Sequence, residues 1–396
     1  MKHSQENNRI IQSLLDTDLY KLTMMQVVLH HFPEAEVEYA FKCRTEGVDL
    51  MPLAAEIKNE ISHLCSLKFT ENEIHYLHNI YYLKSDFVQF LKLFKLSESY
   101  VRISEDENGE LEIRVKGPWL HTIMFEVPIL AIVEEIYTRH QYPDLDLKEG
   151  QQRLLEKIKM IKAHPLGTKL KLMEFGTRRR FSRKWQQHVL ERLNRSVETN
   201  LVGTSNVYFA RELGLTPHGT MAHEYLQAFQ SLGPRLVDSQ KEALEVWAKE
   251  YRGDLGIALT DVVGVDAFIR DFDRYLAKLF DGVRQDSGCP FEWAKKILAH
   301  YKKLGIDPKT KTLVFSDGVD LPLAFELLSE FHEETNLVFG IGTNLTNDMG
   351  VKPISIVMKM TQCNGQPVAK ISDSSGKTMC QDEAYLSYLK KVFEIN

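Results

Sequence analysis

The spacing of apolar residues along the chain changes at about residue 168. The first 150 residues mix helical spacing with strand-like alternation, and two alternating runs flank Asp106-Glu-Asn-Gly109, a sequence that favours a hairpin turn. The polar segment His140–Gly150 is the expected boundary, so we predict a mixed α+β domain over residues 1–150. Its predicted elements are a helix over 19–31, a strand over 37–43, mostly helical structure over 57–94, strands over 100–104 and 111–115, and a long apolar helix over 118–137.

From about residue 168, short apolar runs alternate with amphipathic ones, which is typical of parallel βα units. We predict a catalytic β/α domain over residues 151–362. The tail 363–396, with its Asn364-Gly365 turn and a helix from Asp382, is expected to pack back on the first domain. The predicted strands are 169–175, 201–202, 256–260, 312–315 and 337–339, and the predicted helices lie near 180–195, 206–213, 265–280 and 320–331.

Polar, glycine-rich clusters follow nearly every predicted strand of the second domain. A β/α barrel gathers the carboxyl ends of its strands at one face, where such enzymes keep their active sites. An open doubly wound sheet would concentrate these clusters at one or two switch points. The distribution therefore favours an α/β fold with an irregular, incomplete β/α barrel. The clusters are Gly176–Arg180, Gly203–Asn206, Asp261, Arg284–Gly288, Ser316–Asp320 and Gly340–Asn344.

Composition narrows the range of partners. The 396 residues are 43% hydrophobic and 26% charged with a net charge of −6, which argues against a nucleic-acid-binding protein. The sequence contains no run of 18 apolar residues, the length needed to span a membrane. Its polar start, MKHSQENNRI, lacks the apolar core of a signal peptide. Five scattered cysteines indicate reduced thiols and no structural zinc. A cytoplasmic enzyme acting on small molecules is expected.

The run Arg178-Arg-Arg180, followed by Arg183 and Lys184, stands between a predicted strand and a predicted helix. Cations are unfavourable at a helix N-terminus, so these side chains need an anion, and phosphate fits best because arginine binds it with paired donors. A solvated basic helix start is the alternative interpretation.

Two of the clusters carry carboxylates. Asp286, beside Arg284, would bind sugar hydroxyls or Mg²⁺, or would only cap the next helix. Asp317 stands at a strand end as a second ligand candidate, whereas Asp320 fits an N-cap. Oxygen-rich sites suit Mg²⁺, which leans on substrate phosphates, but no residue is assigned as a direct metal ligand. Gly342 would let backbone N–H groups approach a phosphate, although a tight strand-exit turn explains it equally well.

His223 lies in Gly219-Thr-Met-Ala-His-Glu224, close to a predicted helix start. The positive end of a helix dipole holds an imidazole neutral, and a neutral imidazole nitrogen is a nucleophile toward phosphorus. There is no His-Glu-x-x-His sequence, so a zinc protease site is excluded. A purely structural histidine remains the alternative. The nearby His218 is not included in the predicted site.

Taken together, these motifs resemble the nicotinate phosphoribosyltransferase family in its bacterial form. The resemblance implies the transfer of phosphoribosyl from 5-phosphoribosyl-1-diphosphate to nicotinate in NAD salvage, with release of diphosphate and hydrolysis of ATP. It also implies Mg²⁺, an irregular seven-stranded barrel and a homodimer with shared active sites. The matching segments are Leu15–Lys21, Phe175–Ser182, Gly203–Asn206, Gly219–Glu224, Arg284–Gly288 and Phe339–Thr343.

The resemblance also implies residue roles for the base and for ATP. His223 would be phosphorylated by ATP. Phe175 and, from the facing subunit, Tyr20 would cover the two faces of the pyridine ring, with Asp16 beside them. Related nicotinamide enzymes carry an aspartate where this chain has Ser205, and its absence favours a carboxylate substrate.

The remaining carried-over residues would hold the phosphoribosyl group. Arg178 and Arg284 would bind the nicotinate carboxylate and the product phosphate, in an order that the sequence does not decide. The other substrate-binding residues are Asp286 and Asp317 for the ribose hydroxyls, Gly342 and Thr343 for the 5-phosphate, and Thr177 in the arginine motif.

Three alternatives stay open at this level. A phosphoribosyltransferase for another base, such as nicotinamide, would share every motif except the serine. A barrel enzyme acting on sugar phosphates would need a catalytic lysine or glutamate at a strand end, where this chain has arginines and aspartates. A nucleotide sensor would bind the ligand without turnover.

Overall fold

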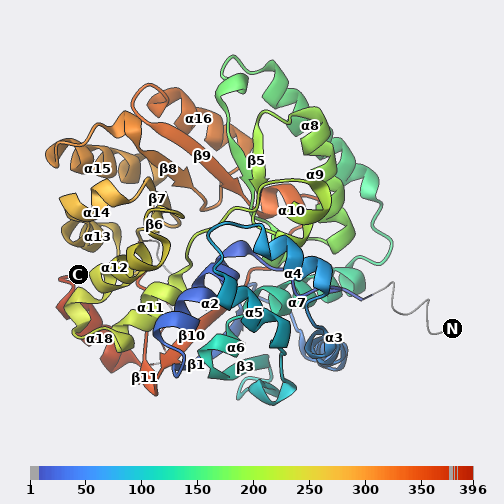
Figure 1. The fold of residues 1–396 in the computed structure, drawn as a ribbon. Coiled ribbons are helices and arrows are strands. Elements are labelled where there is room, and N and C mark those ends of the chain that lie inside the picture. Colours follow the sequence, from blue (N-terminus) through green and yellow to red (C-terminus); the bar gives the residue numbers. More distant parts are fainter. Residues whose placement is uncertain (1–8, 374–377, 379, 381, 396) are drawn as a thin grey trace.

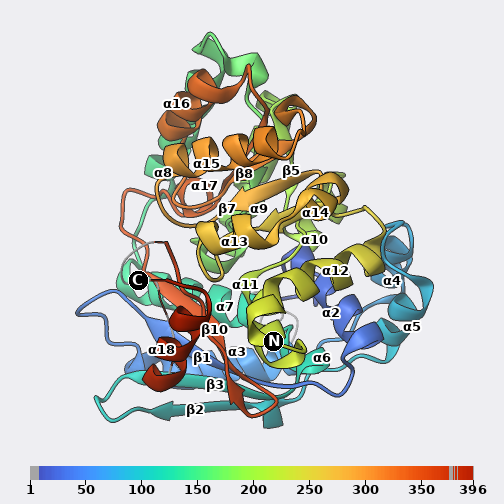
Figure 2. The ribbon, with the colours of Figure 1, turned by 90° about the vertical axis from the view of Figure 1, so that its left-hand side faces the viewer.

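The computed structural model describes residues 9–373, 378, 380 and 382–395. Its elements form two β-sheets, each with its own surrounding helices (Figure 1). The antiparallel sheet lies at the bottom of this view and the parallel sheet at the top. The side view in Figure 2 shows the same division, with β1, β2 and β3 as a layer at one end and α8 and α16 at the other. In the part of the chain that the structure describes, no helix is long and apolar enough to cross a membrane.

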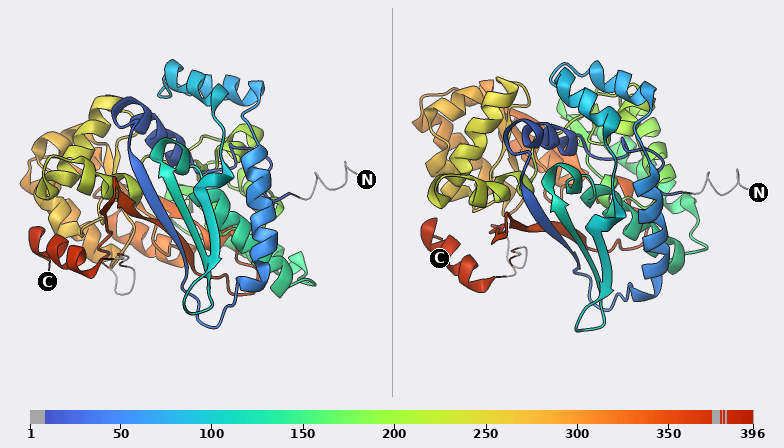
Figure 3. Two further views of the ribbon diagram at one scale, coloured as in Figure 1. Left: turned by 90° about the horizontal axis from the view of Figure 1, so that it is seen from below. Right: turned by 60° about the horizontal axis from the view of Figure 1, so that its bottom comes forward.

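The antiparallel sheet has five strands, in the order β11–β10–β1–β3–β2. Seen from below in Figure 3, the blue and teal strands β1, β3 and β2 run side by side. The predicted hairpin is confirmed: Gly109 has φ +81°, and Asp106 Oδ1 accepts from the amides of Asn108 and Glu110. The strands are β1 (Glu36–Cys43), β2 (Val101–Glu105), β3 (Leu111–Pro118), β10 (Ile356–Cys363) and β11 (Gln366–Pro367).

Helices of the first 150 residues follow the predicted pattern with one correction. The expected single helix over 118–137 is divided into α6 and α7 by a turn at 123–125. Pro128 explains the break, because its ring clashes with the carbonyl four residues back and it has no N–H to donate. The helices are α2 (Leu19–His31), α3 (Ala54–Ser66), α4 (Glu71–His78), α5 (Ser85–Leu93), α6 (Trp119–Thr122) and α7 (Glu126–Gln141).

The parallel sheet has six strands, in the order β5–β4–β9–β8–β7–β6. Its two edge strands do not pair with each other within the described residues. Thr204 instead forms an isolated parallel bridge with Pro217, and Thr220 Oγ1 donates to Ile257 O at 2.7 Å, so the segment 217–220 passes between the edges. The incomplete barrel is thereby confirmed, with six strands in the sheet rather than the seven that the resemblance implied. The strands are β4 (Leu172–Glu174), β5 (Leu201–Thr204), β6 (Ile257–Leu259), β7 (Gly282–Gln285), β8 (Thr312–Phe315) and β9 (Asn336–Ile341).

Helices alternate with these parallel strands, as the sequence predicted. The expected helix over 265–280 is two helices, because Asp273 accepts from the amides of Tyr275 and Leu276 and so begins a new one. The unpredicted α8 precedes the first parallel strand. The helices are α8 (Leu147–Ala163), α9 (Arg183–Ser196), α10 (Val207–Leu213), α11 (His223–Leu232), α12 (Ser239–Tyr251), α13 (Val265–Asp271), α14 (Arg274–Leu279), α15 (Pro290–Lys303), α16 (Leu321–Phe331) and α17 (Thr343–Thr346).

The chain returns to the antiparallel sheet through β10 after the last parallel strand. It then turns at Asn364-Gly365 into β11, and Ile371 forms a parallel bridge with Val263 after β6. The last helix, α18 (Glu383–Val392), lies near α11, where Tyr385 OH donates to Gln230 Oε1. The residues after β10 therefore contact elements next to each of the two sheets. The division into domains at residues 150 and 362 stays a prediction.

Candidate active site

A cavity of about 310 Å³ lies where the parallel strands end. The residues after β4, β5, β7, β8 and β9 line one side of it, and α2, α7 and β10 line the other. All predicted site residues except Asp16 and Thr177 line this cavity. They are Tyr20, Phe175, Arg178, Ser205, His223, Arg284, Asp286, Asp317, Gly342 and Thr343.

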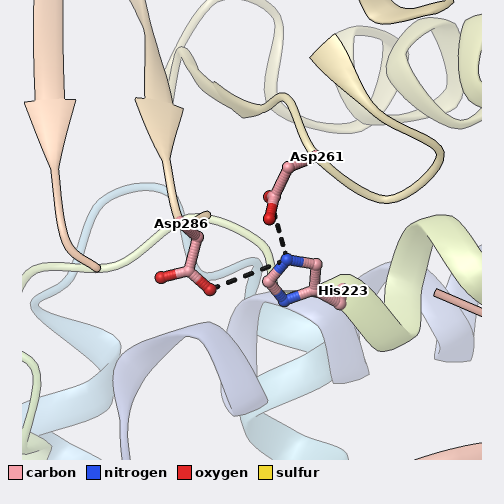
Figure 4. Close-up of side chains that lie close together, drawn as sticks. All are labelled: His223, Asp261 and Asp286. Atoms are coloured by element: carbon pink, nitrogen blue, oxygen red, sulfur yellow. Dashed lines mark hydrogen bonds and ion pairs between the residues drawn. The ribbon is translucent and has the colours of Figure 1, made fainter. Parts of the chain in front are cut away.

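His223 is the first residue of α11, and its ring points toward the ends of β6 and β7 (Figure 4). Its Nε2 lies 3.0 Å from Asp261 Oδ1 and 3.6 Å from Asp286 Oδ2. Lys370 Nζ lies 2.7 Å from the same nitrogen. Burial and the Lys370 charge lower the pKa of His223, so the imidazole is neutral at physiological pH. The structure therefore presents a neutral ring between two carboxylates and an ammonium group.

Asp261 contacts both His223 and Lys370 and holds their side chains in place. Its Oδ2 accepts from Lys370 Nζ at 2.8 Å and from Ser287 Oγ at 2.6 Å. Burial opposes the charge on this carboxylate, but the hydrogen bond from His223 and the charge and hydrogen bond of Lys370 hold the pKa of Asp261 well below its usual range. Asp261 therefore stays ionised and fixes the ring.

His223, Asp261 and Asp286 also offer three ligand atoms within 4.8 Å of one another, a geometry that could hold a cation. Lys370 already donates to Asp261, and its Nζ lies beside His223, so one positive charge at this point comes from the chain itself. Asp286 Oδ1 accepts from Ser316 Oγ at 2.9 Å. Asp286 and Asp317 line the cavity, and their carboxylate oxygens are the ligands here that fit Mg²⁺ best.

Phe175 and Tyr20 line the part of the cavity next to Arg178. A Cβ on Gly340 would lie 2.5 Å from the Phe175 ring, so glycine is required for this ring to lie across β9. Tyr20 lines the same cavity as Phe175. The role of the facing subunit's Tyr20 that the resemblance implied stays a prediction. The position of Tyr20 follows from Leu19 N, which donates to Ser205 O at 2.8 Å and ties the start of α2 to the end of β5.

Arg178 is held loosely by acidic neighbours. Its Nη1 lies 3.4 Å from Glu126 Oε1, and its Nε lies 4.0 Å from Asp18 Oδ2. About 47% of the side chain is exposed. Asp18 itself accepts from Ser205 Oγ at 2.7 Å. Because both contacts are longer than a strong charge-assisted hydrogen bond, the guanidinium retains donors for an anionic ligand.

Asp16 and Thr177 lie beneath the cavity rather than on its wall. Asp16 accepts from Arg180 at 2.7 and 2.8 Å, and both side chains are fully buried. Thr177 Oγ1 accepts from Gln186 Nε2 at 3.1 Å. The arginine run is therefore divided: Arg180 has its anion inside the protein, and only Arg178 and Arg179 reach the cavity. The expectation that all three needed an external anion is corrected.

Several lining residues were not predicted from the sequence. Asp18 stands two residues from the predicted Asp16, at the N-cap of α2. Lys370 arrives from the chain after β11, far from any motif, and no local signal marks it. His218, which had been left out, lines the cavity and lies 2.9 Å from Val202 O through its Nε2. The other unpredicted lining residues with charged side chains are Arg44, Glu126, Arg179, Glu224 and Lys359.

Glycine-rich loops at the ends of parallel strands, aromatic rings and a histidine–aspartate pair in one cavity are typical of an α/β enzyme acting on a small-molecule ligand. Comparison with known proteins identifies its family. Residues 170–396 match the model of the nicotinate phosphoribosyltransferase family, and residues 15–134 match the N-terminal domain of the same family. The chain belongs to the nicotinate phosphoribosyltransferase family.

Similar proteins cover almost the whole chain. It is 58% identical over 388 residues to a nicotinate phosphoribosyltransferase of Burkholderia mallei, covering 98% of this chain and 97% of the relative. The Cupriavidus necator protein of the same name is also 58% identical, with 98% and 99% covered. The crystal structure of the Vibrio cholerae nicotinate phosphoribosyltransferase has a TM-score of 0.94 at 42% identity, covering 98% of this chain and 95% of that one. That from Porphyromonas gingivalis has a TM-score of 0.92 at 33% identity, with 98% and 100% covered.

Proposed function

We propose that this protein transfers the phosphoribosyl group of 5-phosphoribosyl-1-diphosphate to nicotinate, giving nicotinate mononucleotide and diphosphate in NAD salvage, with ATP hydrolysed alongside. One observation carries the proposal. A single cavity joins an aromatic pocket with an accessible arginine, strand-end carboxylates and a neutral histidine. The membership of the chain in the family gives the reaction class.

The aromatic pocket suits the pyridine ring. Phe175 and Tyr20 offer flat apolar surfaces, and Arg178 offers paired donors to the nicotinate carboxylate. The ring nitrogen of nicotinate is already nucleophilic, so no general base is needed. Ser205 donates to Asp18, so this hydroxyl occupies one oxygen of the carboxylate that lies nearest Arg178 in the proposed base pocket.

The other strand ends suit the ribosyl donor. Breaking the bond from C1 to diphosphate builds an oxocarbenium-like cation and a leaving polyanion. We assign Asp286 and Asp317 to the ribose hydroxyls, where carboxylates favour the cation, and Arg284, Gly342 and Thr343 to the 5-phosphate. Mg²⁺ bound at these carboxylates would supply charge neutralisation for the leaving diphosphate.

His223 is assigned as the acceptor of the ATP γ-phosphoryl group. Its nitrogen would attack phosphorus, ADP would leave, and later hydrolysis of the phosphohistidine would release phosphate. A phosphoryl group adds a charge of about −2. Lys370, beside the ring, is placed to hold that charge, and Asp261 fixes the ring orientation.

A homodimer is part of the proposal, as are a cytoplasmic location and no partner beyond the small-molecule substrates. Light scattering on the purified protein measures the oligomeric state, and a monomer with full activity would contradict shared sites.

Substrate competition tests the function. The purified protein is supplied with 5-phosphoribosyl-1-diphosphate, Mg²⁺ and ATP, together with nicotinate or nicotinamide, and the nucleotide product is identified by mass spectrometry. Nicotinate mononucleotide is the expected product. Saturation by nicotinamide with no turnover of nicotinate would instead favour the alternative enzyme, and binding of the donor without turnover of either base would indicate a sensor.

A further inference from the structure

Lys21 forms a buried ionic cluster with two glutamates that the reaction scheme above does not use. The Lys21 side chain is fully buried. Its Nζ lies 2.6 Å from Glu126 Oε2 and donates to both carboxylate oxygens of Glu224 at 2.8 Å. A buried ammonium group is costly unless it is paired, and here it is paired twice.

The cluster connects two parts of the cavity. Glu126, at the start of α7, lies against Lys21 with one oxygen and 3.4 Å from Arg178 Nη1 with the other. Glu224 follows His223 in the first turn of α11. Both glutamates line the cavity. A continuous chain of charges, from Arg178 through Glu126 and Lys21 to Glu224, therefore runs from the base pocket to the helix that carries His223.

We propose that Lys21 is a positioning residue: through Glu126 it sets the guanidinium of Arg178 for the nicotinate carboxylate, and through Glu224 it fixes the first turn of α11 beside His223. The inference rests on the proposed function for the identity of the substrates. It assigns to Lys21, Glu126 and Glu224 a role in joining nicotinate binding to the ATP-dependent step.

The charges support this role over a purely structural one. Two carboxylates share one lysine, so the cluster is balanced only when Arg178 provides the second positive charge. Burial and the charge of Glu126 raise the pKa of Glu224 to about 7, although Lys21 opposes this shift. An apolar cluster would pack this region without any link to Arg178.

The test compares kinetic constants of variants in the intact enzyme. Glu126→Gln keeps the shape of the side chain and removes its charge, and Lys21→Met removes the ammonium group. Each is expected to raise KM for nicotinate about tenfold with kcat changed less than about twofold, because a misplaced Arg178 weakens binding. Lys21→Met is also expected to change the number of ATP molecules hydrolysed per nucleotide formed.

A double-mutant cycle separates positioning from general damage. In an Arg178→Ala background, Lys21→Met should change KM for nicotinate by less than about twofold, because the residue acts through Arg178. Glu135→Gln is the matched control: Glu135 lies further along α7, pairs with Arg139 and does not line the cavity, so KM should not change.

Three outcomes overturn the inference while the proposed function stands: unchanged KM in both Lys21→Met and Glu126→Gln, additive effects in the cycle, or the same KM change in Glu135→Gln. If Lys21→Met does not fold, Glu126→Gln alone and combined with Arg178→Ala decides the same question. Failure of the proposed function is distinct, because the wild-type enzyme would then form no nicotinate mononucleotide.

Discussion

Lys359 shows how the surroundings of the cavity shift the pKa of a single side chain. It lines the cavity on β10, and burial together with Lys370 and Arg44 lowers the pKa of Lys359 to about 7. These cations face the same space as Asp286, so an incoming polyanion meets a surface whose charge depends on pH near neutrality. We therefore expect the charge of Lys359 to contribute to the pH dependence of donor binding.

The pH profile of the free enzyme tests this reading. Because the folded pKa of Lys359 is lowered to about 7, the ammonium form is present below that pH and is lost above it. We expect kcat/KM for 5-phosphoribosyl-1-diphosphate to fall as pH rises above about 7, since kcat/KM reports groups of the free enzyme. Lys359→Arg keeps its charge and should flatten this decline. An identical profile in that variant would remove Lys359 from donor binding.

At the scale of elements, the arginine motif and the start of α2 depend on each other. Ser182, two residues after the segment 178–180, caps α9 by accepting from Trp185 N. Arg180 turns inward and pairs with Asp16. Asn206 Nδ2 also donates to Asp16 at 2.7 Å and joins the start of α10 to the same point. Loss of the carboxylate would leave Arg180 as an uncompensated buried charge.

Asp16→Asn tests whether this residue supports the fold rather than the substrate. We expect the free energy of unfolding to fall by about 3–5 kcal/mol, the usual cost of breaking a buried ion pair. Denaturant unfolding measures the change, and Asp18→Asn, at the cavity wall, is the control with a smaller loss of stability. A stable Asp16→Asn protein with a raised KM would return Asp16 to the substrate site.

The same elements show what the sequence could predict. The helix over 19–31 and the strand over 312–315 were read correctly, because local apolar spacing determines them. Gathering of the strand-end residues followed from barrel geometry. The sequence did not predict the role of Lys370, because only tertiary structure brings this part of the chain to His223. It also did not predict the break in the helix at 123–125, because the apolar pattern continues through Pro128.

For the whole molecule, the site depends on both sheets. The parallel strands supply the loops with Phe175, Arg284 and Gly342, and the antiparallel sheet supplies Lys359. The chain after β11 adds Lys370, so Tyr20, from early in the sequence, and Lys370, from late in it, line the same cavity. We propose that this shared cavity allows ATP to act on the same site that performs phosphoribosyl transfer.

Phosphate mapping tests that claim most directly. The enzyme is incubated with ATP labelled in the γ-phosphate, and acid-labile protein-bound phosphate is located by peptide mapping. We expect the label on His223 in the wild-type enzyme and no label in His223→Ala. The label should be discharged when nicotinate and 5-phosphoribosyl-1-diphosphate are added. Lack of label on the wild-type enzyme, or label that persists in His223→Ala, would contradict it.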